Sequence, residues 1–301
     1  MPELALAFDM GGSKVVAGLV TRDGRILWRM RSEWTPHNGR EVMEALESLG
    51  KSALMHNPNL SPDAIGATIP GVANPDTGTW VSASFSGIHD LPVSGELNRI
   101  FNLPAFADND CRACALAERM FGAGIGCNHF VYLTVSNGVG SAIFSGGQLL
   151  RGANNGAGEL GHCTVEENGR LCRCGKRGCL EMYAAGPGLS STYQELYGGK
   201  VNGKQLADMA RAGDENALRV WRMEGCYLGR AIAFAANLLN PQKVIIGGGL
   251  SLAMNFYRKA LWETIEQNLF VKVNQSLEVL ATPLGYDGGL LGAAALAFQN
   301  K

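Results

Sequence analysis

The chain has 301 residues, of which 46% are hydrophobic and 18% are charged, so it is long enough for two α/β domains or one large one. Its formal net charge of -1 gives no electrostatic reason to bind nucleic acid or an anionic membrane, and we expect neither as a partner. The first residues lack the basic segment and cleavage site of a secretory signal, and no apolar run is long enough to span a bilayer, so we expect a cytoplasmic protein.

A glycine-containing loop joins the first two predicted strands. An apolar run at Leu4–Phe8 precedes it, a β-branched run at 15–20 follows it, and Asp23-Gly24 then marks a hairpin turn. Because the loop connects strand to strand, and not strand to helix, a Rossmann or Walker loop is excluded. The remaining alternatives are an ordinary hairpin turn and a hairpin whose backbone N–H groups face a phosphate. The loop consists of Asp9, Met10, Gly11, Gly12, Ser13 and Lys14.

The next segments alternate between regular elements and loops. Asn38 is placed to cap a helix over 39–56, and a strand at 64–69 ends in Pro70-Gly71. Residues 72–103 are rich in turn-forming and polar residues. We therefore expect this region to be mostly loop, and loops on a rigid scaffold often carry binding groups.

Acidic residues mark the start of the next helix. A short strand at 104–107 runs into Asp108-Asn109-Asp110, and residues at helical spacing follow. Asp110 would lie in the first turn of this helix, where the macrodipole favours an ionised carboxylate. Asn and Asp are also the ordinary capping residues of helices. The residues alone therefore leave capping and catalysis open for Asp110.

The pattern of the first 28 residues returns after a glycine-rich junction at 122–126. A strand at 130–135, a loop at 136–140, a strand at 141–144 and a turn at Gly146-Gly147 repeat its order. This repeat predicts a duplicated domain with two phosphate loops facing each other across a cleft. Asn137-Gly138 is also a strong hairpin dipeptide, so a type I′ turn is the alternative interpretation. Gly140 closes this second loop.

The C-terminal third alternates helices and strands. Helices are expected at 184–196 and 203–212, and Asp214 caps a long helix that Asn240-Pro241 stops. A buried strand at 243–246 leads into Gly247-Gly248-Gly249 and a helix over 251–268, an arrangement that suits close approach of a nucleotide. A strand at 277–281 is followed by a terminal helix that opens near Asp287 and runs to Phe298.

One segment concentrates metal-binding side chains. Zinc prefers a tetrahedron of four nitrogen or sulfur ligands, and this segment supplies four. Because no coordination position remains open, such a site would be structural. Neighbouring Cys163 should point away from the site, and a cluster of free thiols is the alternative. The proposed ligands are His162, Cys172, Cys174 and Cys179; the other cysteines are scattered singly, which argues against a disulfide scaffold.

Two carboxylates flank this segment. Glu159 precedes His162 by three residues, and Glu181 follows Cys179 by two, so a metal would hold both in place. A polyol substrate needs such fixed acceptors, since each hydroxyl donates a directional hydrogen bond. Paired carboxylates are also typical of glycoside hydrolysis, but a hydrolase needs no glycine hairpins.

Taken together, these segments resemble the ROK family (repressors, open reading frames and kinases), and its sugar kinases in particular. The resemblance covers essentially the whole chain. The most specific match runs from Gly158 to Glu181, which resembles the family's G-E-x-G-H and C-x-C-G-x-x-G-C-x-E segments. The loop at 9–14 looks like its first phosphate loop, the segments at 69–71 and 109–110 like its sugar-site segments, and 247–249 and 287–295 like its nucleotide-side and C-terminal segments.

The resemblance implies an actin-like (ribonuclease H-like) duplicated α/β fold with a cleft between two domains. One domain would contain 1–121 together with the C-terminal helix 288–301, and the other would contain 122–287 with the zinc loop. It also implies ATP, Mg²⁺, a structural zinc and a homodimer.

The resemblance also assigns roles. Asp110 would be the general base that takes a proton from the primary hydroxyl of a hexose or an N-acetylhexosamine. The sugar would be held by Gly71, Asn109, Glu159, His162 and Glu181. The nucleotide and its phosphates would contact Asp9, Gly11, Gly12, Ser13, Lys14, Asn137, Gly138, Gly140, Gly248 and Gly249.

The chain departs from the family pattern at several positions. Ser13 and Asn137 stand where threonine is usual in the two phosphate loops, and Ser84 and Ile88 stand where asparagine and tryptophan are common. The alternative from another functional class is a non-catalytic, sugar-sensing regulator. Family repressors carry an N-terminal helix-turn-helix, whereas the first strand here begins at Leu4.

Overall fold

The computed structural model describes residues 3–83, 86–270, 274 and 276–299. The chain divides into two compact units. The first contains Met1–Gly126, Gly152–Asn155 and Tyr286–Lys301, and the second contains Cys127–Arg151 and Gly156–Gly285. The domain boundaries expected from the sequence, at 121/122 and 287/288, stay a prediction.

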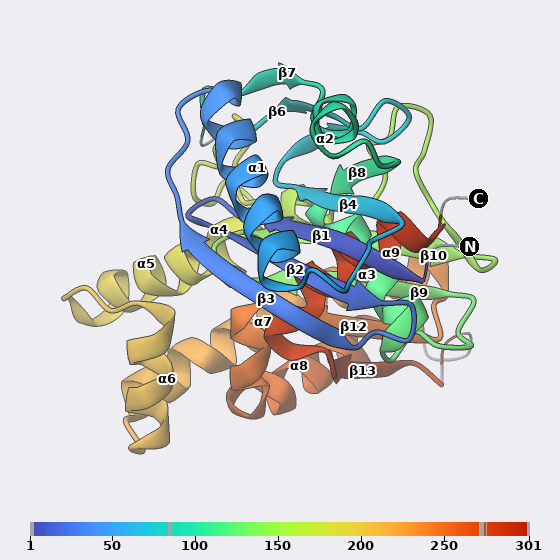
Figure 1. The fold of residues 1–301 in the computed structure, drawn as a ribbon. Helices are drawn as coiled ribbons and strands as arrows, with labels where there is room; N and C mark the ends of the chain where they lie inside the picture. The colour runs from blue at the N-terminus through green and yellow to red at the C-terminus, as the bar shows by residue number, and fades with distance from the viewer. Residues whose placement is uncertain (1–2, 84–85, 271–273, 275, 300–301) are drawn as a thin grey trace. The chain divides into compact units, whose positions relative to one another are not determined.

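A mixed sheet forms the centre of the first unit, in the order β3-β2-β1-β4-β8. The first three strands pair antiparallel as a meander, whereas β4 and β8 add on the other side of β1 as parallel strands. Figure 1 shows these strands in blue to green. Their bounds are β1 Leu4–Met10, β2 Lys14–Thr21, β3 Ile26–Glu33, β4 Ala64–Ile69 and β8 Ala105–Asn109.

Alternation along β1 explains how helices cover this sheet. Leu6 and Phe8 point into a core shared with α1 (Gly39–His56) and α2 (Val93–Phe101), as expected for every second residue of a strand. The intervening side chains are alanines, which leave room for α9 (Gly288–Gln299), and α9 also packs against α3 (Asp110–Phe121). The approach is so close that a Cβ atom on Gly66 of β4 would lie 1.7 Å from the backbone oxygen of Ala293.

The sheet of the second unit repeats this topology in the order β11-β10-β9-β12-β13. Its first three strands form an antiparallel meander, and β12 and β13 add beside β9 as parallel strands. The duplication predicted from the sequence is therefore confirmed as a repeat of topology. The bounds are β9 Phe130–Val135, β10 Val139–Ser145, β11 Gln148–Leu149, β12 Lys243–Gly247 and β13 Glu278–Ala281.

Helices α4 to α8 complete the second unit. The long α7 begins as predicted, because Asp214 accepts a hydrogen bond from the Ala217 amide at 2.8 Å, and it ends at Asn240 in the left-handed conformation. It packs mainly against α8, with Trp221 and Tyr257 fully buried in the shared core. The bounds are α4 Glu181–Ala184, α5 Gly186–Tyr197, α6 Gly203–Arg211, α7 Glu215–Leu239 and α8 Met254–Asn268.

The expectation that residues 72–103 are mostly loop is wrong. They contain α2 and a small antiparallel sheet of β5 (Val72–Asn74), β6 (Thr79–Ser82) and β7 (His89–Leu91). Strands of three or four residues are too short to show a period of two in the sequence. They are stable here because Trp80 and Ile88, each 1% exposed, anchor them in the core of the first unit.

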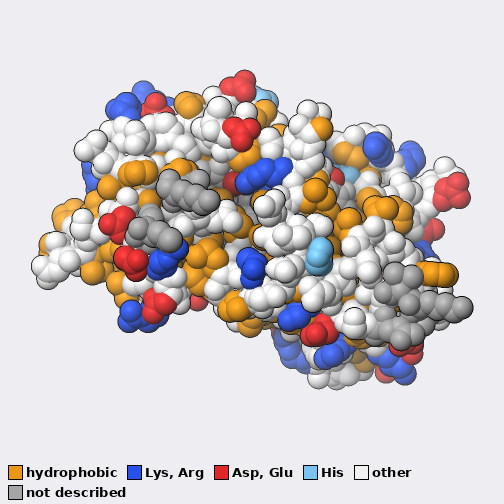
Figure 2. Space-filling model, turned by 90° about the vertical axis from the view of Figure 1, so that its right-hand side faces the viewer, with side chains coloured by type: hydrophobic (Ala, Val, Ile, Leu, Met, Phe, Trp, Pro, Cys, Tyr) orange, Lys and Arg blue, Asp and Glu red, His pale blue; other side chains and the backbone are white. Residues whose placement is uncertain are grey.

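No helix within the described residues is long and apolar enough to cross a membrane. On the face shown in Figure 2, basic and acidic side chains are interspersed, and neither sign forms a continuous patch. This distribution agrees with the formal net charge of -1.

A buried carboxyl in α7 leads to the first prediction. Glu224 is 1% exposed, and neither of its carboxyl oxygens has a hydrogen-bond partner among the residues that the structure describes. Burial raises its pKa well above the ordinary value of 4.5. Glu224→Met should therefore stabilise the protein by about 1–3 kcal/mol, since an unsatisfied buried polar group costs that much. The melting temperature measured at pH 8 should rise by roughly 2–4 °C for each kcal/mol of added stability.

The pH dependence of this effect follows from the sign of the shift. The folded state holds the Glu224 proton more tightly than the unfolded state, so stability falls as pH rises above the unfolded pKa. The difference between variant and wild type should therefore grow from pH 5 to pH 8. Glu215→Met, at a position 81% exposed on the same helix, is the control. A lower melting temperature for Glu224→Met at pH 8 would contradict the prediction.

Candidate functional site

In the first unit, polar side chains gather at the carboxyl ends of the parallel strands. Phe8 of β1 pairs with Ala67 of β4, and Ile69 of β4 pairs with Asn109 of β8. This register brings the residues that end the three strands to one edge of the sheet. In open α/β sheets this edge is where ligands bind.

Asp110 begins α3 at this edge. Its Oδ1 accepts hydrogen bonds from the Cys111 amide at 2.8 Å and from Asn109 Nδ2 at 3.0 Å. Burial raises the pKa of the Asp110 carboxyl to about 6; the charge of Asp9 adds to the rise, and the hydrogen bonds oppose it. Asn109 is the true helix cap, because its side chain accepts from the Cys111 and Arg112 amides. Capping therefore does not account for Asp110.

Asp9 lies near the end of β1 and, like Asp110, is partly buried. Burial raises its pKa, while a hydrogen bond of 3.0 Å from the Thr68 hydroxyl and the charge of Lys14 lower it. The first turn of α9 approaches so closely that a Cβ atom on Gly289 would lie 2.4 Å from Asp9 Oδ2. The carboxylate thus lies at a helix N-terminus, where the macrodipole favours negative charge. No sequence pattern predicts the Thr68 contact.

Gly71 lies beside Asn109, as the two predicted sugar-site segments require. The side-chain amide of Asn109 donates a hydrogen bond to the Gly71 carbonyl at 2.9 Å. Gly71 has a φ of 100°, and a Cβ atom there would lie 2.7 Å from the Ser82 carbonyl oxygen, so only glycine fits.

The first glycine loop is a tight hairpin braced by a tryptophan. The Gly11 amide donates to the Lys14 carbonyl at 2.8 Å, and the Trp34 indole N–H donates to the Gly11 carbonyl at 2.7 Å. Gly12 and Ser13 are left exposed at the tip. Trp34 was missed from the sequence, because no local pattern connects it to a loop more than twenty residues upstream.

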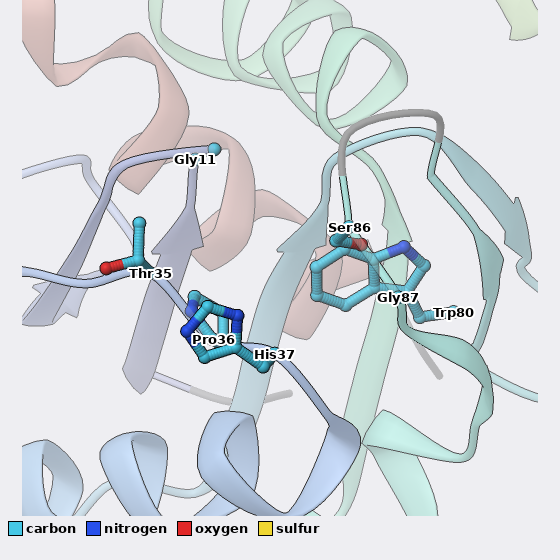
Figure 3. A pocket seen from close by; sticks show the side chains of 8 residues that line it. Gly11, Thr35, Pro36, His37, Trp80, Ser86 and Gly87 are labelled. Carbon is cyan, nitrogen blue, oxygen red and sulfur yellow. The ribbon is translucent and has the colours of Figure 1, made fainter.

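A pocket of about 480 Å³ opens next to this loop (Figure 3). Three segments of the first unit surround it: the loop itself, the connection from β3 to α1, and the small sheet with the residues that follow β6. Ser84, one of the departures from the family pattern, lies outside the described residues. The lining residues are Gly11, Gly12, Thr35, Pro36, His37, Trp80, Ser86 and Gly87.

The second glycine loop, in the second unit, is shorter than predicted. It spans only 136–138, because β10 already begins at Val139 and includes Gly140. The Ser136 amide donates to the Gly138 carbonyl at 2.9 Å, and neither Asn137 nor Gly138 has a positive φ. The alternative of a type I′ turn is therefore wrong, since that turn needs positive φ at both residues.

Two further segments contact the strand end that carries this loop. Glu181 Oε2 accepts a hydrogen bond from the backbone N–H of Val139 at 3.1 Å. The same oxygen is so close to Gly138 that a Cβ atom there would lie 2.8 Å from it. Gly248 has a φ of 80°, and a Cβ atom there would lie 2.4 Å from the Val135 carbonyl oxygen. The second unit therefore brings Glu181, the second loop and the glycine run 247–249 together.

The four proposed metal ligands form one cluster. Their candidate ligand atoms all lie within 4.8 Å of one another, with Cys172 Sγ 3.7 Å from His162 Nδ1 and Cys174 Sγ 3.6 Å from Cys179 Sγ. Tetrahedral zinc with Zn–S bonds of about 2.3 Å separates its sulfurs by roughly 3.8 Å, so the spacing fits. Cys163 is not in the cluster; its thiol points to the Glu159 carbonyl.

The electrostatics of this cluster also suit a cation. Burial raises the pKa of Cys179 to about 12 and raises that of Cys172, whereas a hydrogen bond from the Lys176 amide lowers that of Cys174. Without a cation the two buried thiols stay protonated at neutral pH, and metal binding would replace those protons.

Glycines fix the segment that carries Glu159 and His162. A Cβ atom on Gly161 would lie 1.9 Å from the Val139 carbonyl oxygen, and one on Gly158 would lie 2.8 Å from that of Ser141. The segment therefore packs backbone against backbone on β10. The His162 amide donates to the Glu159 carbonyl at 3.0 Å within a 3₁₀ turn, which sets the spacing of the two side chains.

Arg170 was also missed from the sequence. Its guanidinium donates to the Met182 and Gly188 carbonyls and to Glu195, and it stacks 4.6 Å over the Tyr183 ring. It thus ties the cysteine loop to α4 and α5. Single arginines carry no sequence signal for such a role.

Comparison with known proteins gives a consistent assignment. The sequence model of the ROK family matches residues 5–300. A glucokinase from Thermotoga maritima is 34% identical over 98% of both chains, and an N-acetylmannosamine kinase from Escherichia coli is 34% identical over 98% of this chain and 99% of its own. The solved structure of a ROK glucokinase from Streptomyces griseus, in complex with glucose and AMPPNP, has a TM-score of 0.86 at 29% identity.

That structure covers 99% of this chain and 100% of its own, so the duplicated actin-like α/β fold expected from the sequence is confirmed. The family match leaves out only a few terminal residues, and the relatives share a third of the sequence over their full length. The chain therefore belongs to the ROK family.

Proposed function

We propose that this protein is a sugar kinase that transfers the γ-phosphoryl group of ATP to the primary hydroxyl of a hexose or an N-acetylhexosamine. The named relatives support the reaction class, since they are glucokinases and N-acetylmannosamine kinases. The observation that carries the assignment is Asp110, a partly buried residue whose carboxyl pKa is raised to about 6 by burial, at the edge of the first sheet where the parallel strands end.

Asp110 is suited to be the general base. A base works best when its pKa lies near the working pH, and at pH 7 a carboxyl with a pKa near 6 is mostly ionised. It takes the proton of the sugar hydroxyl as the oxygen attacks the γ-phosphorus, and ADP leaves. The carboxylate is held for this by the Cys111 amide and Asn109, which fix the orientation of Oδ1.

The sugar hydroxyls would be held by the residues that the family resemblance assigns to them. In the first unit these are Asn109 and the backbone of Gly71, which are hydrogen-bonded to each other. In the second unit they are Glu159, His162 and Glu181. His162 Nδ1 lies 3.7 Å from Cys172 Sγ, so Nε2 would be the nitrogen that is free to bind the substrate.

The phosphates would be bound by the two glycine loops, and Lys14 adds a positive charge at the first. Gly248 and Gly249 would lie against the nucleotide, where the absence of side chains permits close approach. We propose that Mg²⁺ enters with the nucleotide and neutralises the charge that develops on the phosphates.

Zinc would be held by His162, Cys172, Cys174 and Cys179. When bound, it supplies cross-linking and no reactive position, because four protein ligands complete its coordination. The flanking residues Glu159 and Glu181 would keep their places because the loop between them is closed. The further expectations of a homodimer and a cytoplasmic location stay predictions.

A panel of hexoses and amino sugars tests the proposal directly. The wild type should release ADP when one of these sugars is added with Mg²⁺, and Asp110→Asn should lower kcat by about 10²–10⁴-fold, the usual contribution of a general base. Sugar affinity should stay within a few-fold, because the amide keeps the shape of the carboxyl. Asp76→Asn, at an exposed position, is the control.

Two results would count against this assignment. Failure of every sugar in the panel to stimulate ADP release would favour the sugar-sensing regulator. Near-normal turnover by Asp110→Asn would remove Asp110 from its role as base.

The raised pKa gives a second prediction for the same residue. The free enzyme should lose kcat/KM for the sugar as pH falls, with an apparent pKa of about 6 and a tenfold loss per pH unit below it. Above pH 7 the profile should be flat until another group titrates. Initial rates at saturating ATP and Mg²⁺ from pH 5 to pH 8 measure this limb. A flat profile down to pH 5 would rule out Asp110 as the titrating base.

Metal analysis tests the zinc proposal. Purified wild type should contain one zinc per chain, and Cys172→Ala or Cys174→Ala should lose it together with sugar affinity, since His162 and Glu181 depend on the closed loop. Cys226→Ala, outside the cluster, should keep its zinc. A folded and fully active wild type without zinc would overturn the proposal.

A further inference from the structure

A buried ion pair joins the residues on either side of the proposed base in the sequence. Asp108 of β8 and Arg112 of α3, four residues apart in the chain, contact each other at 2.9 Å with side chains only 1% and 7% exposed. Such a pair costs desolvation energy and is weak evidence for stability alone. The other hydrogen bonds of its two side chains therefore indicate its role.

Arg112 also reaches a second segment of the chain. Its Nη2 donates to the backbone carbonyl of Asn155, which has a φ of 57° in the left-handed region. Residues 152–155 belong to the first unit, although Arg151 before them and Gly156 after them belong to the second. The chain thus enters the first unit for four residues and leaves it again, and Arg112 binds the last of the four.

The loop that contains these residues is closed at its base. The Ala157 amide donates to the Arg151 carbonyl at 3.1 Å, so 151–157 forms a compact loop. The residue after it is Gly158, which is fixed on β10 and is followed directly by Glu159. A displacement of the loop would therefore act on the segment that carries Glu159.

On its other side the ion pair supports the base. Asp108 Oδ1 accepts one hydrogen bond from the backbone N–H of Asn109 at 2.7 Å and another from Arg112 Nη1 at 2.9 Å. Asn109 in turn donates to Asp110 Oδ1. One buried guanidinium is thus hydrogen-bonded to the strand end that carries the base and to the loop that precedes Glu159.

We propose that Arg112 is a positioning residue, which with Asp108 anchors the 151–157 loop, the segment that leads into Glu159, on the strand end that carries Asn109 and Asp110. Arginine suits this role because its planar group offers donors in two directions and stays charged when buried. This proposal rests on the proposed function, because that function gives Asn109, Asp110 and Glu159 their roles toward the sugar.

The test uses a double variant of the full-length protein. Asp108→Asn with Arg112→Met removes both charges together, so that no unpaired charge is left buried, and methionine keeps the unbranched stem without a donor for Asn155. Glu96→Gln with Arg99→Met, which removes an exposed pair of the same kind, is the matched control.

Two readouts are expected to change. Trypsin should cleave after Arg151 at least about tenfold faster in the double variant, measured by intact-mass spectrometry, because the loop has lost its anchor. The KM for the sugar should rise at least about tenfold, while the KM for ATP stays within about threefold. The control should match the wild type in both.

Each outcome decides a separate point. Unchanged cleavage after Arg151 would overturn the tether, and faster cleavage with an unchanged sugar KM would overturn the positioning role. If the wild type phosphorylates no sugar, the proposed function fails; sugar affinity, measured by calorimetry in both proteins, then decides whether Arg112 positions the binding groups.

Discussion

Parallel pairing of β1 with β4 and of β4 with β8 is the constraint on which the rest of the first unit depends. It brings the ends of three strands to one edge, so that Asp9, Asn109 and Asp110 are neighbours although about a hundred residues separate the first from the others. A shift of one residue in either register would turn these side chains to the opposite face. The second sheet repeats this topology and carries the second glycine loop at its own meander.

Close backbone packing is the second recurring feature. Gly66 packs against α9, Gly161 against β10 and Gly248 against β9, and at each a Cβ atom would collide with a backbone oxygen. At these three of the 40 glycines, close backbone packing excludes any side chain.

Three carboxyls of this protein meet different environments. Asp108 is paired with Arg112, Asp110 is hydrogen-bonded yet raised in pKa, and Glu224 has no hydrogen-bond partner among the described residues. The first arrangement suits a structural link and the second a base poised near neutral pH. Glu224 makes no hydrogen bond among the described residues that would suit either role. Its replacement is therefore expected to stabilise the protein.

The sequence by itself determined the elements and the chemistry that are local in the chain. Strand, glycine loop, strand and turn were recognisable twice because each signal lies within about ten residues, and the spacing of His162 and the three cysteines predicted the cluster that the structure shows. The family resemblance also came from short, contiguous motifs, and the family match over residues 5–300 confirms it.

Only the tertiary structure decided contacts between distant segments. The small sheet at 72–91, the brace of Trp34 on the first loop and the hydrogen bond from Arg112 to Asn155 leave no periodic pattern, because single side chains and strands of three residues have none. The raised pKa of Asp110 belongs to the same class. Burial and the charge of Asp9 produce it, and both exist only once the strands have paired.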